Sequence, residues 1–560
     1  MRILGITMSI PLKFEMSVIS NTYGFGHDAA AVLVEDGILI SGIEEERLNR
    51  IKHTNKAPIS AMKFCLYSNH LILKDIDAIA VNFDETYINS VLKEMYLLDR
   101  KQKEFYDARF YVHRAVIEAF GEDVEDNKII FVPHHIAHAE STYALSGFDE
   151  SLVLVIDGMG DNIAATLQYS LEEIVLHILK EYSKVTGHLK LCLAGGVAHN
   201  CSLNGKLLYS GLFQDIFVQP AAHDAGGAIG AALHIIKNNK KNINISRLDN
   251  VYFGTNIGDS NEILDSLNKW HEFINFRKSN NIEKDTAKLL SEGSVIGWVQ
   301  GRSEFGPRAL GNRSILADPR PSQNKVIINE MVKKRESYRP FAPSVLDEYI
   351  DQYFILPTNQ KQFPFMNFVL KVKEEKQPIL GAVTHIDGTA RVQTVSKSTN
   401  VKYWSLINEF SKLTGVHILL NTSFNNNAEP IVDSVEDSIV CFLTTKLNYL
   451  IIDNYIISKK KNDYKKYLNM IPNLVPHILL CETKKFSSFN EICNDYYITF
   501  NFDREYVFSI SKQIYYLLKN FDGKKTLKDL IQEFNLNDGK NEKRIVDELL
   551  ILWTNRLITL

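Results

Sequence analysis

Short apolar runs alternate with amphipathic stretches through the first part of the chain. RILGI, AAAVLVED and ILISGI predict three strands, with EDG as a tight turn between the last two. APISAMKFCLYSNH has the spacing of an amphipathic helix, and DAIAVNF predicts a further strand. EEERLNRIKH predicts a charged helical segment, for which a solvated helix face is the less favoured alternative to a role in the site. Strands and helices that alternate in this way are typical of an α/β fold.

Breaks in this pattern divide the chain into three regions. The stretch AALHIIKNNKKNINISRLDN, rich in Lys and Asn, separates a first region (1–250) from a second α/β region (251–462). A third region covers 463–560, and its last part, 494–560, has a pattern of its own. We find no internal repeat of fixed period.

Composition describes an ordinary globular protein. Hydrophobic residues make up 45% of the 560 residues and charged residues 23%, and a net charge of −4 favours neither nucleic acid nor an anionic membrane as partner. The start MRILGITMSI lacks the layout of a signal peptide, and no apolar run reaches the roughly 18 residues that a membrane span needs. The six cysteines form no CxxC pair. We therefore expect a cytoplasmic protein with reduced thiols.

Histidines and an aspartate gather in FVPHHIAHAESTYALSGFDESLVLVIDGMGD. If AHAESTYAL and the residues before it are helical, His134 and His138 stand at i and i+4 on one face, where two imidazoles can reach one cation. The run SLVLVI predicts a buried strand that delivers Asp157 into a glycine-rich turn. This set suits a divalent ion with open positions, such as iron or manganese. Spacing alone gives equal weight to histidines that merely satisfy backbone groups in a core.

Two glycine-rich turns follow predicted strands. LKLCLAGGVAHNCSLNGKL places Gly195, Gly196 and Asn200 at a helix start, where backbone amides can meet a nucleotide or phosphate, although tight helix–strand packing explains the same pattern. IFVQPAAHDAGGAIGAAL places Asp224 at the next helix start, either as a second carboxylate ligand or as a simple N-cap. Strand-end acids beside glycine turns predict a two-lobed fold that clamps a nucleotide and a metal.

The motifs of both halves resemble those of the O-carbamoyltransferase family. In the first half these are GHDAAAVLVEDG, EEERLNRIKH, HHIAHA, LCLAGGVAHN and PAAHDAGGAIGAAL. In the second half they are VIGWVQGRSEFGPRALGNRSILADPR, KKRESYRPFAPSVL, THIDGTARVQTV and LLNTSFNNNAEPIV. The resemblance covers about residues 1–462 and implies a TsaD-like first domain of the actin/hexokinase type and a YrdC-like second domain.

The resemblance also implies cofactors and the residues that bind them. Iron(II), or another divalent metal, would be held by His134, His138, Asp157 and Asp224. ATP, with Mg²⁺, and carbamoyl phosphate would be the co-substrates for a carbamoyl adenylate, which Arg and Lys side chains suit because it gathers several negative oxygens. The implied nucleotide- and intermediate-binding residues are Gly195, Gly196, Asn200, Arg302, Arg308, Arg313, Lys333, Arg335, Arg339, Arg391, Asn421, Ser423 and Asn425.

The implied activity is transfer of the carbamoyl group to a hydroxyl of a natural-product acceptor. A general base is then required, and the pairs His27 with Asp28 and Lys52 with His53 qualify by position. His135, the histidine left outside the implied metal set, is assigned to the pocket or the substrate.

The sequence departs from the family pattern after Asp157. DGMGDNIAATLQYS runs directly into the predicted helix LEEIVLHILKEYSKVTG, so a long segment that the family carries there is absent, and the turn ends in Asp161 instead of Glu. An alternative function follows: a catalytically reduced protein that keeps adenylate formation, with the shortened first domain as a binding scaffold. Completion of the site by another chain is a further alternative. Threonylcarbamoyl transfer to tRNA is a weaker third hypothesis, disfavoured by the domain order and the acidic net charge.

The end of the chain, 494–560, resembles a PqqD-like winged-helix module. It predicts a strand pair, a helix, a DG turn and two more helices, with apolar helix faces at Ile510, Ile514, Leu517 and Leu518. In its relatives this module binds leader peptides, which implies a peptide-borne or carrier-borne acceptor as an alternative to a small molecule. The same apolar faces would otherwise form a docking or homodimer surface.

Overall fold

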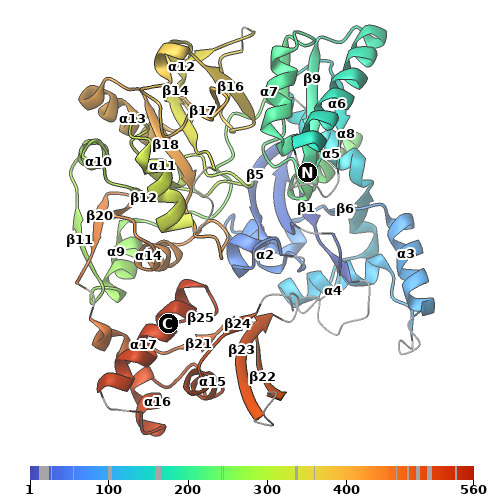
Figure 1. Ribbon diagram of the computed structural model, residues 1–560. Coiled ribbons are helices and arrows are strands. Elements are labelled where there is room, and N and C mark those ends of the chain that lie inside the picture. The colour runs from blue at the N-terminus through green and yellow to red at the C-terminus, as the bar shows by residue number, and fades with distance from the viewer. Residues whose placement is uncertain are drawn as a thin grey trace.

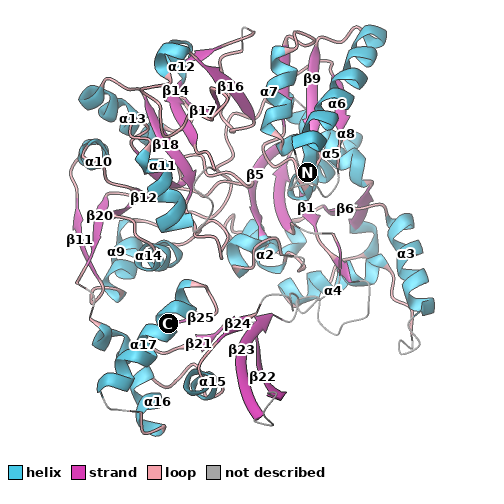
Figure 2. Cartoon of the chain, in the orientation of Figure 1, coloured by secondary structure: helices cyan, strands magenta, loops and turns pink. Residues whose placement is uncertain are grey.

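The computed structural model describes residues 1–11, 24–26, 28–54, 56–98, 104–157, 165–240, 243, 245–333, 339–358, 360–461, 463–475, 478–486, 492–500, 507–536 and 539–560. Helices and strands are interspersed along this whole length (Figure 2). The α/β class predicted from the sequence is confirmed. Within the described ranges, no helix has both the length and the apolar character needed to cross a membrane.

The first sheet has the strand order β5-β4-β1-β6-β7. Its strands are β1 (Arg2–Thr7), β4 (Ala30–Glu35), β5 (Ile38–Glu44), β6 (Ala78–Asn82) and β7 (Ile129–Val132). Strands β1, β6 and β7 are parallel, whereas β4 and β5 form an antiparallel hairpin beside β1. The hairpin turns at Asp36 and Gly37, whose φ angles of 51° and 87° are those of a two-residue type I′ turn.

Helices cover both faces of this sheet. On one side lie α2 (Ile59–Tyr67), α3 (Glu85–Leu98) and α4 (Ala108–Phe120) (Figure 1). On the other side α8 (Asp224–Asn239) packs against β1, β4 and β6. A Cβ on Gly5 would lie 2.1 Å from the carbonyl oxygen of Ala228, so β1 and α8 approach too closely for any larger residue there. The pair β2 (Ile10–Pro11) and β3 (Gly24–Phe25) follows β1.

A second sheet has the order β10-β9-β8, with all its strands parallel. Its strands are β8 (Leu152–Val155), β9 (Lys190–Ala194) and β10 (Asp215–Val218), and its helices are α5 (His134–Ser146), α6 (Ala165–Thr186) and α7 (Cys201–Tyr209). Helix α5 packs on this sheet and against α8, where a Cβ on Gly230 would lie 1.7 Å from the carbonyl oxygen of Ala137. The predicted helix and strand around His134 and Asp157 are therefore confirmed, but the strand is only partly buried and not buried as predicted.

The charged segment EEERLNRIKH is helical only over α1 (Glu45–Asn49). Arg50 ends the helix with φ 62° and donates a hydrogen bond to the carbonyl oxygen of Ile431 in the second region. The solvated-face interpretation is wrong, because Glu45 is 3% exposed and Arg47 1% exposed. Glu45 accepts backbone N–H groups of α2, and Arg47 donates to the carbonyl oxygen of Gly306.

The second region is built on a ten-stranded sheet of order β11-β20-β19-β12-β13-β18-β14-β17-β16-β15. Its strands are β11 (Ile274–Lys278), β12 (Ile296–Val299), β13 (Arg313–Ala317), β14 (Ala342–Leu346), β15 (Phe354–Ile355), β16 (Phe368–Val372), β17 (Thr389–Val395), β18 (Ile418–Ser423), β19 (Tyr449–Ile452) and β20 (Tyr455–Lys459). Its helices are α9 (Ser260–Lys269), α10 (Ile282–Ser291), α11 (Gln323–Ile328), α12 (Ile350–Tyr353), α13 (Val401–Thr414) and α14 (Val435–Thr444).

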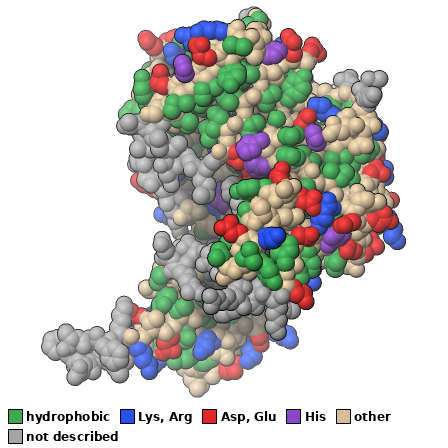
Figure 3. All heavy atoms as spheres, turned by 90° about the vertical axis from the view of Figure 1, so that its right-hand side faces the viewer, with side chains coloured by type: hydrophobic (Ala, Val, Ile, Leu, Met, Phe, Trp, Pro, Cys, Tyr) green, Lys and Arg blue, Asp and Glu red, His purple; other side chains and the backbone are tan. Residues whose placement is uncertain are grey.

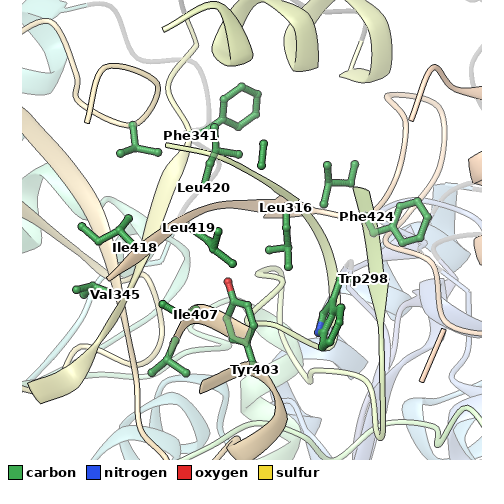
Figure 4. Packing of buried hydrophobic residues seen from close by; sticks show 14 of the residues in the cluster. Trp298, Leu316, Phe341, Val345, Tyr403, Ile407, Ile418, Leu419, Leu420 and Phe424 are labelled. Carbon is green, nitrogen blue, oxygen red and sulfur yellow. The ribbon is translucent and has the colours of Figure 1, made fainter. Parts of the chain in front are cut away.

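A large apolar core fills this region and continues into the second sheet of the first region. Trp298 of β12, Tyr403 of α13 and Phe424, directly after β18, are among its largest buried side chains (Figure 4). The indole N–H of Trp298 donates to the carbonyl oxygen of Gly311 at 2.9 Å, so its polar atom is satisfied inside the core. The first and second regions therefore share one apolar core. The domain boundary at residue 250 stays a prediction.

The third region forms a hairpin, a short third strand and three helices below the rest of the chain (Figure 1). Its elements are β21 (Asn473–Leu474), β22 (Ile478–Phe486), β23 (Ile492–Phe500), β24 (Phe508–Ser509), α15 (Lys512–Leu518), α16 (Leu527–Glu533), α17 (Gly539–Thr554) and β25 (Ile558–Thr559). The predicted strand pair and three helices are confirmed. The assignment of Ile510, Ile514, Leu517 and Leu518 to a docking face is wrong, because each is at most 9% exposed, inside the region's own core.

Candidate metal centre and active site

Four side chains converge where β8 and β10 end and α5 and α8 begin. His134 and His138 lie one turn apart in the first turns of α5. Asp157 follows β8, and Asp224 is the first residue of α8, after β10. Their ligand-type atoms all lie within 4.8 Å of one another. Parallel β8 and β10 in one sheet bring their carboxyl ends to the same edge, which explains why residues 67 positions apart meet.

The distances within this cluster fall into two groups. His134 Nε2 donates a hydrogen bond to Asp157 Oδ2 at 2.8 Å. The remaining nitrogen–oxygen separations are longer: 3.7 Å from His134 Nε2 to Asp224 Oδ1, 3.6 Å from His138 Nε2 to the same oxygen, and 3.9 Å from His138 Nε2 to Asp157 Oδ2. The hydrogen bond with His134 holds the pKa of Asp157 well below its ordinary range, so this carboxyl is ionised at neutral pH.

The donor set fits a divalent cation. His138 is fully buried, yet neither of its ring nitrogens has a hydrogen-bond partner among the described residues, and its Nε2 faces two carboxylate oxygens at distances too long for hydrogen bonds. A buried imidazole without partners is costly, and a cation among these atoms would remove that cost. Two imidazoles and two carboxylates, with the side chains of His134 and Asp157 partly exposed, suit iron(II) or manganese better than a closed structural zinc site.

The glycine pair after β9 orients one of these carboxylates. Gly195 has φ 87°, and a Cβ there would lie 2.2 Å from the carbonyl oxygen of Ile156, so only glycine fits. Gly196 donates its backbone N–H to Asp157 Oδ1 at 3.1 Å. Asn200 caps α7 by accepting from the backbone N–H of Leu203 at 3.1 Å. The structure thus gives each of these residues a structural role, and their assignment to nucleotide binding stays a prediction.

A second buried cluster adjoins the metal ligands, and the sequence analysis did not single it out. His199 Nε2 lies 3.1 Å from His223 Nδ1 and accepts the backbone N–H of His223 at 3.2 Å. His223 Nε2 lies 3.8 Å from Glu44 Oε1. Burial lowers the pKa of His199 well below its ordinary value and raises the pKa of Glu44. The sequence feature that could have identified this cluster is the position of both histidines inside the glycine motifs AGGVAHN and PAAHDAGG.

The predicted base residues are only partly brought together. His53 Nδ1 lies 3.1 Å from Asp28 Oδ1, and both residues have left-handed φ angles, 51° and 54°. The hydrogen bond with Asp28 raises the pKa of His53. Lys52 is exposed beside this pair, and His27 lies outside the described residues.

His135 points away from the metal ligands. It is exposed on α5, and its ring is perpendicular to that of His134 at a centroid distance of 5.5 Å. It is the residue of the HHIAH motif that offers no atom to the four-residue cluster. Phe83 also contacts the cluster, because its ring stacks on that of His134 at a centroid distance of 6.2 Å and an interplanar angle of 14°.

The arginines of the second region differ in their surroundings. Arg313 is fully buried and donates to the carbonyl oxygens of Asp433, Gln300, Gly301, Asn312 and Thr255, which occupies every nitrogen of its guanidinium. Arg302 donates to backbone carbonyl oxygens of Gly254, Ile40 and Phe253. Within the described part of the chain, Arg308 donates only to Cys201 Sγ, at 3.9 Å, and its Nε is buried without a hydrogen-bond partner. Of these three, Arg308 has the donors best placed for a ligand.

The end of β18 and the loop after it carry two sets of polar contacts. Asn421 donates to Gln393 at 2.9 Å and to Ser344 at 3.1 Å. Ser423 donates to Asn425 at 2.8 Å, and Asn425 donates to the carbonyl oxygen of Glu429 at 2.8 Å. The other residues implied by the resemblance lie apart from this loop. Arg391 lies on β17, and Arg339 is exposed, with its carbonyl oxygen accepting from Asn329. Lys333 ends the π-helix Asn329–Lys333, and Arg335 lies outside the described residues.

Comparison with known proteins decides the family. The sequence model named Carbamoyltransferase N-terminus matches residues 19–162 and 160–233, and Carbamoyltransferase C-terminus matches residues 287–459. Nodulation protein NolNO of Sinorhizobium fredii is 39% identical over 665 residues, covering 100% of this chain and 97% of that protein. The chain belongs to the O-carbamoyltransferase family.

Other O-carbamoyltransferase relatives come from different biological settings. Nodulation protein NolO of Bradyrhizobium diazoefficiens is 48% identical over 402 residues, covering 71% of this chain and 73% of that protein. The 3'-hydroxymethylcephem-O-carbamoyltransferase of Amycolatopsis lactamdurans is 32% identical over 332 residues, covering 58% of this chain and 60% of that protein. A nodulation protein and a cephem-modifying enzyme thus share the family with this chain.

The comparisons support the shortening predicted after Asp157. The N-terminal family model matches in two pieces that overlap at residues 160–162. The alignment with NolNO extends over 665 residues, whereas this chain has 560, so some positions of NolNO have no counterpart here. Asp161 itself lies outside the described residues.

Proposed function

We propose that this protein is an ATP-dependent O-carbamoyltransferase that works in two stages. ATP, carbamoyl phosphate and water would first yield carbamoyl adenylate, pyrophosphate and phosphate. An acceptor hydroxyl would then attack the carbamoyl carbon, the bond from that carbon to the phosphate oxygen would break, and AMP would leave. The observation that carries this proposal is the convergence of His134, His138, Asp157 and Asp224 in a chain of the O-carbamoyltransferase family.

The two stages would take place in different regions. Residues 1–250, with the TsaD-like arrangement implied by the motifs, would carry out the transfer, and residues 251–462, the YrdC-like part, would form the adenylate. The shared apolar core between the two regions supports a closed path for the intermediate, because packing there excludes the water that would hydrolyse it.

The metal-ligand cluster would hold iron(II) or another divalent ion. When bound, such an ion supplies positive charge for the oxygens of the adenylate. The chain's own residues prepare this position: Gly196 fixes one oxygen of Asp157, and His134 keeps that carboxyl ionised. Burial of His138 keeps one side of the cluster dry, while the partly accessible side chains of His134 and Asp157 leave the other side open.

The acceptor hydroxyl would lose its proton to His53. Asp28 holds this imidazole by a 3.1 Å hydrogen bond and raises its pKa, which strengthens it as a proton acceptor near neutral pH. The imidazole is 67% exposed, so an acceptor can reach it. The name of the Amycolatopsis relative specifies a hydroxymethyl acceptor, which supports a hydroxyl-bearing natural product here, either a small molecule or one borne by a peptide.

The test separates the two stages. Purified protein with ATP should release pyrophosphate only when carbamoyl phosphate is present. Candidate acceptors should then gain the mass of one carbamoyl group. Pyrophosphate release that does not depend on carbamoyl phosphate would refute the first stage.

A second candidate function is supported by the missing segment. A reduced protein of this family would form carbamoyl adenylate and keep the shortened first region as a binding scaffold. It predicts carbamoyl-phosphate-dependent pyrophosphate release without the gain of one carbamoyl mass by any acceptor tested under the same conditions.

A further inference from the structure

The connection between β16 and β17 (Figure 1) ends in a tight turn, within the motif THIDGTARVQTV. The resemblance gives a role to Arg391 alone in this motif. His385 donates its backbone N–H to the carbonyl oxygen of Thr389 at 2.7 Å, and Gly388 donates to the carbonyl oxygen of His385 at 3.1 Å. Gly388 has φ 75°, a left-handed value that favours glycine. The turn therefore fixes His385 beside the first residue of β17.

The hydrogen bonds of His385 determine its tautomer. Thr389 donates its single hydroxyl proton to Asp387 Oδ1 at 2.6 Å. His385 Nδ1 lies 3.0 Å from the same hydroxyl oxygen, so Nδ1 must carry the ring proton and donate it. Burial lowers the pKa of His385 to about 4 against the opposing charge of Asp387, so the imidazole is neutral near pH 7. The other ring nitrogen, Nε2, is therefore an acceptor.

This acceptor has no donor within the described part of the chain. His385 Nε2 is buried, and no hydrogen bond reaches it from the described residues. A buried polar atom without a partner is costly, and nearly all such atoms in folded proteins are satisfied by protein, water or ligand. The position of His385 decides between these sources.

His385 adjoins the residues that the resemblance assigns to the carbamoyl adenylate. Thr389, Arg391 and Gln393 alternate along β17 and therefore share one face of the sheet. Gln393 accepts a hydrogen bond from Asn421 of β18 at 2.9 Å. Arg391 is two residues, or roughly 7 Å, along the strand from Thr389. Its positive charge acts on the imidazole of His385 and lowers the pKa further. A neutral acceptor and a cation thus stand close together on one face.

This combination suits a ligand that carries a phosphoryl group near an N–H donor. On the face of the molecule that Figure 3 shows, acidic and basic side chains of the described residues are intermixed, so that surface does not concentrate positive charge. Carbamoyl phosphate has its NH2 group close to its phosphoryl group. In ATP the ribose separates the adenine NH2 from the phosphates. The short separation between His385 and Arg391 therefore favours carbamoyl phosphate.

We infer that His385 Nε2 accepts a hydrogen bond from the NH2 group of carbamoyl phosphate and makes the site selective for the carbamoyl group. This inference rests on the proposed function, because it concerns the co-substrate of the first stage. A methyl group in place of the NH2, as in acetyl phosphate, would leave Nε2 unpaired. Sites built around such a hydrogen bond reject ligands that lack the donor. Thr389 and Asp387 act as positioning residues, since they fix the tautomer that leaves Nε2 unprotonated.

The experiment uses the full chain and two stable probes. Phosphonoacetamide is carbamoyl phosphate with CH2 in place of the bridging oxygen, and acetonylphosphonate is the same molecule with CH3 in place of NH2. Calorimetry measures the Kd of each. We expect the wild type to bind phosphonoacetamide at least tenfold more tightly. His385→Leu should abolish this preference by weakening phosphonoacetamide alone, whereas His271→Leu, at an exposed histidine after α9, should keep it.

Further variants separate recognition of the NH2 group from a structural role. His385→Gln retains an acceptor and should keep part of the preference at an unchanged melting temperature. Thr389→Val removes the hydroxyl that receives the Nδ1 proton and should reduce the preference without changing the Kd of acetonylphosphonate. Arg391→Leu should weaken both probes, because both carry the phosphonate.

Three results would overturn the inference: no preference in the wild type, equal weakening of both probes by His385→Leu, or a preference that survives this substitution. Weaker ATP binding by His385→Leu with an intact preference would assign Nε2 to the adenine and overturn it as well. Pyrophosphate release that depends on carbamoyl phosphate, without any preference between the probes, would count against this inference alone. A preference without such release would count against the proposed function alone.

Discussion

Arg556 and Glu429 form a two-point ion pair that joins the C-terminal region to the loop after β18. Arg556 Nε donates to Glu429 Oε2 at 2.8 Å, and its Nη2 donates to Oε1 at 2.7 Å. Arg50 of the first region donates to the same carboxylate at 3.2 Å. Since Asn425 donates to the carbonyl oxygen of Glu429, all three regions of the chain meet beside the proposed adenylate-binding element.

Arg556→Gln is therefore expected to affect more than the C-terminal region. Glu429 is 4% exposed and would keep only Arg50 as a cationic partner, so the loss should stay below the roughly 3–5 kcal/mol expected when a buried charge is left with no partner. The melting temperature should fall. Carbamoyl-phosphate-dependent pyrophosphate release should also slow, because Glu429 is hydrogen-bonded to the Ser423–Asn425 loop. Lys525→Gln, which breaks an exposed pair with Glu533 in the same region, is the control and should change neither value.

Truncation of 463–560 is then expected to impair adenylate formation as well as acceptor modification. An independent recognition module would leave adenylate formation intact. Intact pyrophosphate release by the truncated chain would show that the contact between Arg556 and Glu429 is dispensable for the first stage.

The same ion pair predicts a pH dependence of stability. Burial alone would raise the pKa of Glu429, but Arg556 and Arg50 lower it below the ordinary value of 4.5. A carboxyl with a depressed pKa contributes stability that is fully present above its unfolded pKa and is lost as the pH falls below it. The difference in melting temperature between wild type and Arg556→Gln should be constant from pH 6 to pH 8 and should shrink below about pH 4.5. A difference that grows in acid would contradict this assignment.

Local patterns in the sequence were sufficient for most of the strands and helices. They placed His134 and His138 one helical turn apart and Asp157 and Asp224 after apolar strands, but only the family resemblance joined the four residues as one metal-ligand set. The contact between Arg556 and Glu429 spans 127 positions, and nothing near either residue marks its partner. Apolar spacing also failed to distinguish a partner-binding face from the region's own core at Ile514 and Leu518.

The arginines of the second region also show that local sequence patterns do not reveal long-range contacts. Their motif context indicated phosphate binding for all of them, but whether a guanidinium faces a ligand or a carbonyl oxygen depends on how distant loops pack. Arg313→Gln is expected to lower the melting temperature, because several buried carbonyl oxygens lose their donor. Arg308→Gln should instead slow pyrophosphate release at an unchanged melting temperature. The reverse result would exchange the structural and ligand-binding roles of these two residues.

Lys333 and Arg335 provide the sharpest test of adenylate formation. Each would donate charge-assisted hydrogen bonds to phosphate oxygens, worth roughly 1.5–3 kcal/mol apiece. Lys333→Ala or Arg335→Ala should therefore slow pyrophosphate release at least tenfold. Lys325→Ala, in the preceding helix α11, serves as the matched control. Turnover at the wild-type rate by both variants would place the phosphate site elsewhere.

The metal-ligand cluster predicts that the full chain binds about one divalent ion, with iron(II) as the first choice. His138→Ala should lower the affinity at least tenfold, because it removes a buried ligand whose Nε2 faces both carboxylates at 3.6 and 3.9 Å. His135→Ala is the matched control, since this neighbouring histidine is exposed on the same helix and lies outside the cluster. Elemental analysis after reconstitution and equilibrium dialysis measure both. Equal metal content in the two variants, or none in the wild type, would mean that these side chains form a polar core instead of a metal site.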